Sequence, residues 1–110
     1  MTTQRQIKFV GVEIVRFVDK HQPGFVECEL VDAEGRKHKF MDKVPIFTAQ
    51  DLDSSSAYPQ SGSVRCEVLA EWRDPAGRAL SQISTIRPDD VESSEGLSEF
   101  IVLSQQVSEH

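Results

Sequence analysis

The chain of 110 residues has little of several residue types on which function is often built. It holds two cysteines, Cys28 and Cys66, which are too few for a disulfide framework and have no paired C-x-x-C spacing for zinc or redox chemistry. No apolar run reaches the length of a signal peptide or a membrane span. We therefore expect a cytoplasmic protein that does not enter a membrane, in which both cysteines pack as small core residues.

Familiar catalytic motifs are absent as well. The serine-rich segments contain no G-x-S-x-G nucleophile turn, and the glycines form no phosphate-binding loop of the type G-x-x-x-x-G-K-[ST]. The acidic residues between Asp89 and Glu99 lack the ordered alternation of a calcium loop. We expect no cofactor and no metal, and the residues favour a binding protein over an enzyme.

The charge that is present is mostly negative and is unevenly distributed. The formal net charge is -6, and residues 1–43 hold eight Lys/Arg against seven Asp/Glu, whereas residues 44–110 hold four against eleven. Binding of nucleic acid depends on neutralising its phosphates, so this balance disfavours a nucleic-acid partner. A basic protein is the better expectation.

Side-chain patterning predicts strands. Residues 7–18 carry Val, Ile and Phe at neighbouring positions rather than at helical intervals, and residues 25–31 alternate strictly between apolar and polar. Four more strands are expected over residues 36–44, 64–73, 78–87 and 97–103. The length fits one domain over residues 1–110, with flexible ends at residues 1–6 and 104–110.

Two tight reversals set the expected pairing of these strands. Residues 32–35 read Asp-Ala-Glu-Gly and residues 74–77 read Asp-Pro-Ala-Gly, a chemistry that suits a type I turn followed by a glycine with positive φ. The first hairpin then places Glu29 opposite Lys39 and Cys28 opposite Phe40. The second places Trp72 opposite Leu80 on the inner face and Cys66 opposite Ile86.

These elements predict an all-β fold. Six twisted antiparallel strands can hide their edges by curling, so we expect a small, partly closed barrel of the OB or SH3 type. At most one short helical turn is expected, capped by residues 48–51. A two-sheet β-sandwich is the alternative.

The first strand carries large apolar side chains on both faces, so something must cover one of them. The cover is either internal, from residues 45–63 or the last strand, or external, from a partner protein or a second copy of the chain. An external cover predicts a protein interface of aromatic anchors with an acidic rim. Its residues are Phe9, Glu13, Val15, Phe17, Phe25, Glu27 and Glu29.

A second candidate site lies on the expected inner face. His38 and Asp42 share that face, and beside Trp72 they could form a small-molecule pocket in which Asp42 orients His38 as a base. A hydrogen-bonded structural histidine is the alternative reading.

Three functions therefore stand as hypotheses. The first is a small cytoplasmic protein-binding module, such as an inhibitor or immunity-like protein for a basic partner. The second is a small-molecule-binding barrel with weak enzymatic potential. The third is binding of single-stranded nucleic acid, for which an exposed stripe of aromatic and basic residues is not evident.

Overall fold

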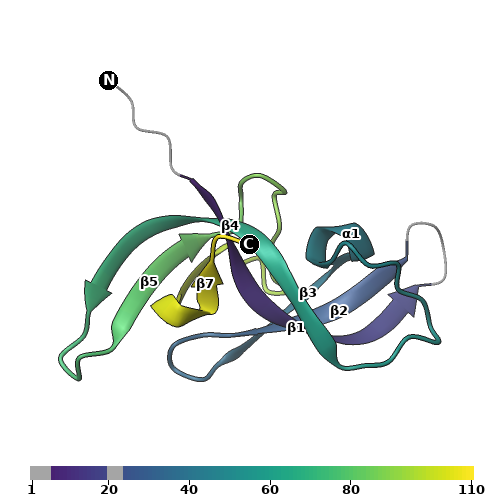
Figure 1. Ribbon diagram of the computed structural model, residues 1–110, viewed down its shortest axis with the longest axis horizontal. Coiled ribbons are helices and arrows are strands. Elements are labelled where there is room, and N and C mark those ends of the chain that lie inside the picture. Colours follow the sequence, from purple (N-terminus) through teal and green to yellow (C-terminus); the bar gives the residue numbers. More distant parts are fainter. Residues whose placement is uncertain (1–5, 20–23) are drawn as a thin grey trace.

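The structure is a computed structural model that describes residues 6–19 and 24–110. It is an all-β fold in which one antiparallel sheet of six strands curls into a half-barrel, with one short α-helix (Figure 1). The elements are β1 (Ile7–Asp19), β2 (Phe25–Val31), β3 (Lys37–Lys43), α1 (Val44–Phe47), β4 (Gln60–Arg73), β5 (Ala79–Ser84), β6 (Glu99–Leu103), the 3-10 helix η1 (Ser104–Gln106) and β7 (Val107–Ser108). The predicted partly closed barrel of six antiparallel strands is confirmed.

The strand order explains how the sheet holds together. Its path is β3-β2-β1-β4-β5-β6, so β1 and β4 join the first three strands to the last three. Near its start β1 also pairs with β7, at Phe9 and Val10, beyond the reach of β2. Residues 104–108, expected as part of a flexible end, thus form η1 and an added strand. The other end expected to be flexible is residues 1–6, of which residues 1–5 lie outside the described residues.

Both predicted reversals form as the turn chemistry requires. In each one the glycine N–H donates to the carbonyl of the aspartate three residues earlier, at 3.0 Å for Gly35 and 2.9 Å for Gly77, and both glycines have positive φ. Each aspartate carboxylate also accepts the backbone N–H four residues on, that of Arg36 or Arg78. The register of the first hairpin follows, with Glu29 opposite Lys39 and Cys28 opposite Phe40, as predicted.

A third reversal of the same kind, which the sequence analysis does not predict, occurs at residues 93–96. Here Ser93 takes the place of the aspartate. Its hydroxyl accepts the N–H of Leu97 at 3.1 Å, and the N–H of Gly96 donates to its carbonyl at 2.8 Å. A serine hydroxyl can replace an aspartate carboxylate in such turns, although it does so more weakly.

The two edge strands, β3 and β6, do not pair with each other along their length, and single hydrogen bonds bridge the gap between them. The N–H of Ala33 donates to the carbonyl of Ile101 at 2.9 Å, and the N–H of Ser94 donates to the carbonyl of Lys39 at 2.8 Å. The loop of residues 85–98 fills this gap and places Val91 in the core, almost without exposure. We call this line of contacts the seam.

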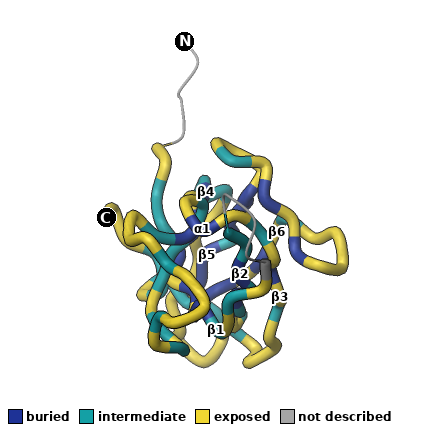
Figure 2. The backbone as a smooth tube through the Cα atoms, turned by 90° about the vertical axis from the view of Figure 1, so that its right-hand side faces the viewer, coloured by how far each residue is buried: buried dark blue, intermediate teal, exposed yellow. Residues whose placement is uncertain are grey.

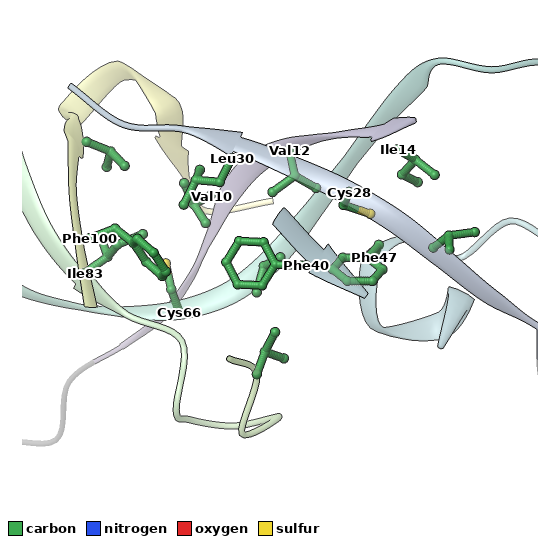
Figure 3. Packing of buried hydrophobic residues seen from close by; sticks show 14 of the residues in the cluster. Val10, Val12, Ile14, Cys28, Leu30, Phe40, Phe47, Cys66, Ile83 and Phe100 are labelled. Carbon is green, nitrogen blue, oxygen red and sulfur yellow. The ribbon is translucent and has the colours of Figure 1, made fainter. Parts of the chain in front are cut away.

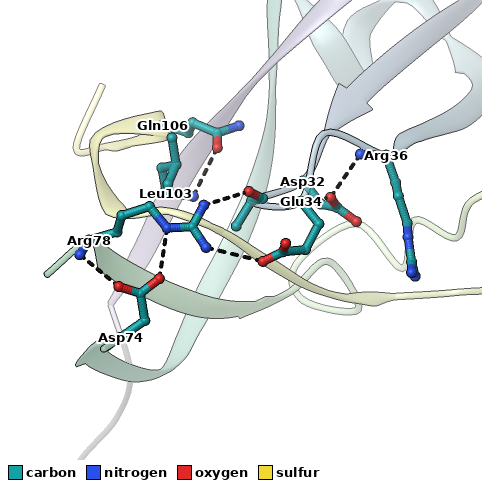
Figure 4. A network of polar contacts seen from close by, with 8 residues as sticks. Asp32, Glu34, Arg36, Asp74, Arg78, Leu103 and Gln106 are labelled. Carbon is teal, nitrogen blue, oxygen red and sulfur yellow. Dashed lines mark hydrogen bonds and ion pairs between the residues drawn. The ribbon is translucent and has the colours of Figure 1, made fainter. Parts of the chain in front are cut away.

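Arg78 strengthens the seam from outside (Figure 4). Its guanidinium binds the Asp74 carboxylate at 2.7 Å in its own hairpin. It also reaches the other hairpin, where it donates to the Ala33 carbonyl at 2.9 Å and to the Glu34 carboxylate at 3.1 Å. One side chain therefore ties the two predicted turns together.

The core lies inside the curl of the sheet. Most buried stretches of the chain lie in the middle of the molecule in Figure 2, and Figure 3 shows Phe40, Phe47 and Phe100 packed among aliphatic side chains. Cys28 and Cys66 are fully buried members of this cluster and carry free thiols. Their predicted place in the core is confirmed.

Bulges in β1 and β4 change the predicted facing of side chains near the ends of these strands. In β1 the register shifts between Ile14 and Arg16, so Phe17 pairs with buried Val26 and packs on the core instead of facing outward. In β4 the register shifts between Val68 and Ala70. Trp72 pairs with Leu80 as predicted, but it is 39% exposed and faces out, and Cys66 is not opposite Ile86.

The helix lies four residues earlier than expected. It occupies residues 44–47, not the turn beginning at Thr48, and Pro45 stands in its first turn. Proline suits that position because its fixed φ matches a helix and its missing N–H would have no partner there. The helix buries Val44 and Phe47 against the sheet. The connection of residues 45–63 thus supplies part of the internal cover.

Gly62 generates the first prediction. A Cβ at this position would lie 2.8 Å from the Cδ1 of Ile14 and 3.0 Å from the backbone oxygen of Phe47. Gly62→Ala should therefore overpack the junction of β4 and α1 and lower the free energy of unfolding by about 1–3 kcal/mol. Gly11→Ala is the matched control, because its nearest neighbour would lie 4.0 Å away. Equal urea midpoints for the two variants would contradict this account.

Candidate functional site

Two glutamates on the outer face of the sheet stand at a cleft. Glu13 of β1 lies directly opposite Glu29 of β2 in the antiparallel register, and alternation with buried Val12 and Ile14 turns Glu13 outward. The cleft has a volume of about 350 Å³. Its lining comes from β1, β2, β4, η1 and the residue before β4: Gly11, Val12, Glu13, Glu29, Val31, Pro59, Gln60, Ser61 and Gln106. We call it the Glu13–Glu29 cleft.

Gln106 forms a rigid wall of this cleft. Its side-chain oxygen accepts the N–H of Leu103 at 2.9 Å, and its side-chain nitrogen donates to the carbonyl of Val31 at 2.8 Å. Both ends of the amide are thus held, one by β6 and one by β2. The cleft therefore keeps its shape through the same contacts that close the barrel.

The three outer glutamates differ in their partners. Glu27 binds Arg16 at 3.1 Å. Glu29 lies opposite Lys39, but its ion pair is with Lys37, at 3.7 Å. Within residues 6–19 and 24–110, Glu13 has no ion-pair partner. The cleft thus brings together the carboxylates of Glu13 and Glu29. The nearest paired cation is the largely exposed ammonium group of Lys37, which does not line the cleft.

The aromatic part of the predicted interface is not gathered on one surface. Phe17 faces the core because of the bulge, and half-buried Val15 is the extra residue of that bulge. Phe9 and Phe25 are half-buried near opposite ends of β1, since Phe25 lies opposite Asp19, ten residues and roughly 33 Å along the strand from Phe9. Of the predicted set, only Glu13 and Glu29 come together at the cleft.

The predicted pocket of His38, Asp42 and Trp72 does not assemble. His38 binds Asp32, not Asp42, with 2.8 Å between Nε2 and Oδ2. The carboxylate of Asp42 instead accepts the N–H of Lys43 at 2.8 Å. Trp72 faces outward from β4, and none of the three residues lines the Glu13–Glu29 cleft or the larger cavity described below.

His38 has a structural setting. Its ring lies 4.9 Å from that of Phe100, centroid to centroid, and both His38 and its partner Asp32 are 14% exposed at the side chain. Burial raises the pKa of the Asp32 carboxyl, but hydrogen bonds from His38 and from the N–H groups of Arg36 and Glu34 outweigh it, so the pKa lies below its ordinary value of 3.8. The pair of His38 and Asp32 therefore stabilises the turn of residues 32–35.

A larger cavity, of about 810 Å³, opens beside α1. Phe17, Gly24 and Val44 form part of its wall, and the rest comes from Pro45 and residues 48–54. Two acidic residues, Asp51 and Asp53, line it, and the carboxylate of Asp53 already accepts hydrogen bonds from the backbone N–H and the hydroxyl of Ser55. These bonds lower the pKa of Asp53. The cavity is thus a space beneath one connection rather than a meeting of chemical groups from several strands.

The thiols offer no nucleophile. Burial, followed by the nearby charge of Glu27, raises the pKa of Cys28 to about 12, and burial together with Glu67 raises the pKa of Cys66 to about 11. Among residues 6–19 and 24–110 there is no group of three or more His, Cys, Asp or Glu placed to hold a metal ion. No helix in the same ranges is long and apolar enough to cross a membrane. Another histidine of the chain, His21, lies outside the described residues.

Comparison with models of known protein families, with curated proteins and with solved structures finds no match to this chain. Function must therefore be inferred from the geometry. Alternation in the two N-terminal strands identified Glu13 and Glu29 in advance. Gln60, Ser61 and Gln106 were missed, since they reach the cleft only through strand pairing over long sequence distances.

The Asp32 pair gives a pH prediction. A carboxyl whose pKa is lowered on folding contributes stability above its unfolded pKa and loses it as the pH falls through the folded value. The difference in unfolding free energy between the native chain and Asp32→Asn should therefore be constant near neutrality and shrink below about pH 4. Urea titrations from pH 7 to pH 2.5 measure it, with exposed Asp51→Asn as control. A difference that stays the same throughout would show that the charge of Asp32 is unimportant.

Proposed function

We propose that this chain is a binding module for a basic protein, and that the Glu13–Glu29 cleft receives a lysine or arginine side chain of that partner. The observation that supports this most is the placement of two carboxylates directly opposite each other at the wall of one cleft. An inhibitor or immunity-like protein is one form of such a module. Its proposed setting is the cytoplasm, where free thiols such as those of Cys28 and Cys66 stay reduced.

Electrostatics give the cleft a reason to bind a cation. Like charges directly opposite in an antiparallel pair destabilise the sheet, and Lys37, with a side chain 69% exposed, offsets little of this from 3.7 Å. A cationic side chain between the two carboxylates would remove the repulsion. It would also form charge-assisted hydrogen bonds, which are stronger than neutral ones.

The other walls suit the stem of a long basic side chain. Lysine and arginine bury their methylene groups on apolar surface while the charged end stays with polar groups. Val31 and Pro59 provide apolar surface in the cleft, and Ser61 and Gln106 provide polar groups. Because Gln106 is already held at both ends, binding requires little ordering of this wall.

The charge of the whole chain supports the same partner. A net charge of -6 attracts basic proteins at long range and raises their rate of encounter. It opposes binding of single-stranded nucleic acid. The small-molecule hypothesis has weaker support, because His38, Asp42 and Trp72 do not share a cavity.

Capture of the natural partner tests the proposal. The tagged chain, incubated with extract of the cells that produce it, should retain a basic protein at equal stoichiometry. Recovery of that protein should fall at least about tenfold with Glu13→Gln combined with Glu29→Gln, since a lost charge-assisted contact of about 1.4 kcal/mol weakens binding tenfold. Glu92→Gln combined with Glu95→Gln lowers the charge equally at another surface and should retain the protein. Recovery of only the monomer, or equal recovery by both variants, would contradict the proposal.

The position of binding can be measured separately. Titration of the isotope-labelled chain with N-acetyl-arginine amide should shift the amide resonances of Glu13, Glu29 and the Gln106 side chain, and Glu13→Gln should weaken this binding about fivefold. Glu95→Gln, in the turn of residues 93–96, should leave it unchanged. Shifts spread evenly over all acidic residues would indicate charge attraction without a site.

A further inference from the structure

A second outer surface, on the last three strands of the sheet, has an uncharged centre. In the antiparallel register Trp72 lies opposite Leu80 and Leu80 opposite Leu103, while the next row joins Ala70, Gln82 and Ile101. Partners in antiparallel strands project from the same face of the sheet. We call these six residues the Trp72 face: Ala70, Trp72, Leu80, Gln82, Ile101 and Leu103.

The core confirms that this face points away from the barrel interior. Ile83, Phe100 and Val102 alternate with its residues along β5 and β6 and belong to the core cluster. Leu80 is only 5% exposed, yet within the described part of the chain it is not a member of that cluster. Its strand partners are Trp72 and Leu103 of the same face. Trp72 and Ile101 remain 39% and 45% exposed.

The rim of the Trp72 face is acidic. At the end of the face next to Trp72 and Leu80 lies the ion pair of Asp74 and Arg78. Glu34 binds the same guanidinium group of Arg78. At the other end, next to Ala70, Gln82 and Ile101, Ser84 of β5 pairs with Glu67 of β4 on one side and with Glu99 of β6 on the other. The rim thus holds four carboxylates and one guanidinium group, that of Arg78, which already forms ion pairs with Asp74 and Glu34. Arg65, further along β4, is bound to Asp89 and forms a neutral pair.

An apolar centre without charge, in a chain of which 27% is charged, is typical of a contact surface with a defined partner. Tryptophan is the residue type most enriched at energetically dominant contacts. The acidic rim distinguishes between occupants. Two copies of this chain would bring like-charged rims together, whereas a basic surface would complement them.

We propose that the Trp72 face is a docking surface for a partner protein that presents an apolar projection surrounded by lysine and arginine. The inference rests on the proposed function in that it takes the same class of basic partner, but none of its six residues lines the Glu13–Glu29 cleft. Trp72 and Ile101 are the anchors, and Glu67 and Glu99 supply the charge that selects the partner. Gln82 is held toward the rim by its bond to Glu99, at 2.9 Å.

Trp72 is the only tryptophan in the chain, so its fluorescence reports directly on this surface. The probe is the capped hexapeptide Arg-Arg-Leu-Leu-Arg-Arg. It should shift the Trp72 emission to shorter wavelength and reduce quenching by acrylamide about twofold. The capped peptides Glu-Glu-Leu-Leu-Glu-Glu and Arg-Arg-Ser-Ser-Arg-Arg, which lack the charge or the apolar centre, should do neither.

Variants separate the two parts of the surface. Ile101→Ser should weaken binding of the basic apolar peptide at least about fivefold, whereas Met41→Ser, an equally exposed apolar position on β3, should not change it. Glu67→Gln combined with Glu99→Gln should abolish the preference for the basic over the acidic peptide. An unchanged emission, or an equal response to both peptides, would overturn the proposal. So would an emission that moves to shorter wavelength as the protein itself dimerises in sedimentation, because the occupant would then be a second copy.

Glu13→Gln keeps the two proposals distinguishable. It removes one carboxylate of the cleft and leaves the Trp72 face intact, so the fluorescence response to the hexapeptide should persist in this variant. A lost response at Trp72 together with intact binding of N-acetyl-arginine amide at the cleft would overturn the Trp72 face alone. The reverse result would overturn the cleft alone.

Discussion

The seam between β3 and β6 is the constraint on which the rest of the structure depends. A sheet of six strands has two edges, and their unpaired N–H and C=O groups must find partners or remain open to other chains. Here the partners come from the turn at Ala33, from Ser94 in the loop of residues 85–98, and from the side chain of Gln106. The barrel is thus closed by a turn, a loop and an amide, not by a seventh long strand.

Both candidate surfaces are by-products of that closure. Gln106 links β6 to β2, from Leu103 to Val31, and the same amide forms a wall of the Glu13–Glu29 cleft. Arg78 ties one hairpin to the other, and in doing so it places Asp74 and Glu34 at the rim of the Trp72 face. The contacts that stabilise the fold therefore also position the carboxylates that would meet a partner.

The two surfaces share a sign of charge but differ in kind. The cleft sets two carboxylates against each other with a small apolar wall, which suits a single cationic side chain. The Trp72 face is a wider apolar area with acidic margins, which suits a protein surface. Side chains on β1 and β2 form most of the first, and those on β4, β5 and β6 form the second. Gln106 connects the two surfaces, because it lines the cleft and its side-chain oxygen accepts the N–H of Leu103.

Local chemistry allowed much of the fold to be predicted. The aspartate and glycine of residues 32–35 and 74–77 specify their turns, and those turns set the register of Glu29 with Lys39 and of Trp72 with Leu80. The same chemistry passed unnoticed at residues 93–96, where serine replaces aspartate. Proline at position 45 was also a sufficient signal for the start of α1. These features depend on a few neighbouring residues, so the sequence contains them.

The facing of strand ends was decided only in the folded chain. A bulge inserts one residue and reverses the side chains that follow it, and no glycine marks the insertions at Val15, Val18 and Leu69. Phe17 is therefore half-buried against the core and Trp72 is exposed, opposite to simple alternation. The sequence by itself determined an acidic, all-β chain with two reversals and three outward glutamates. Tertiary structure decided what surrounds those glutamates and that Trp72 meets water, because both depend on contacts between segments far apart along the chain.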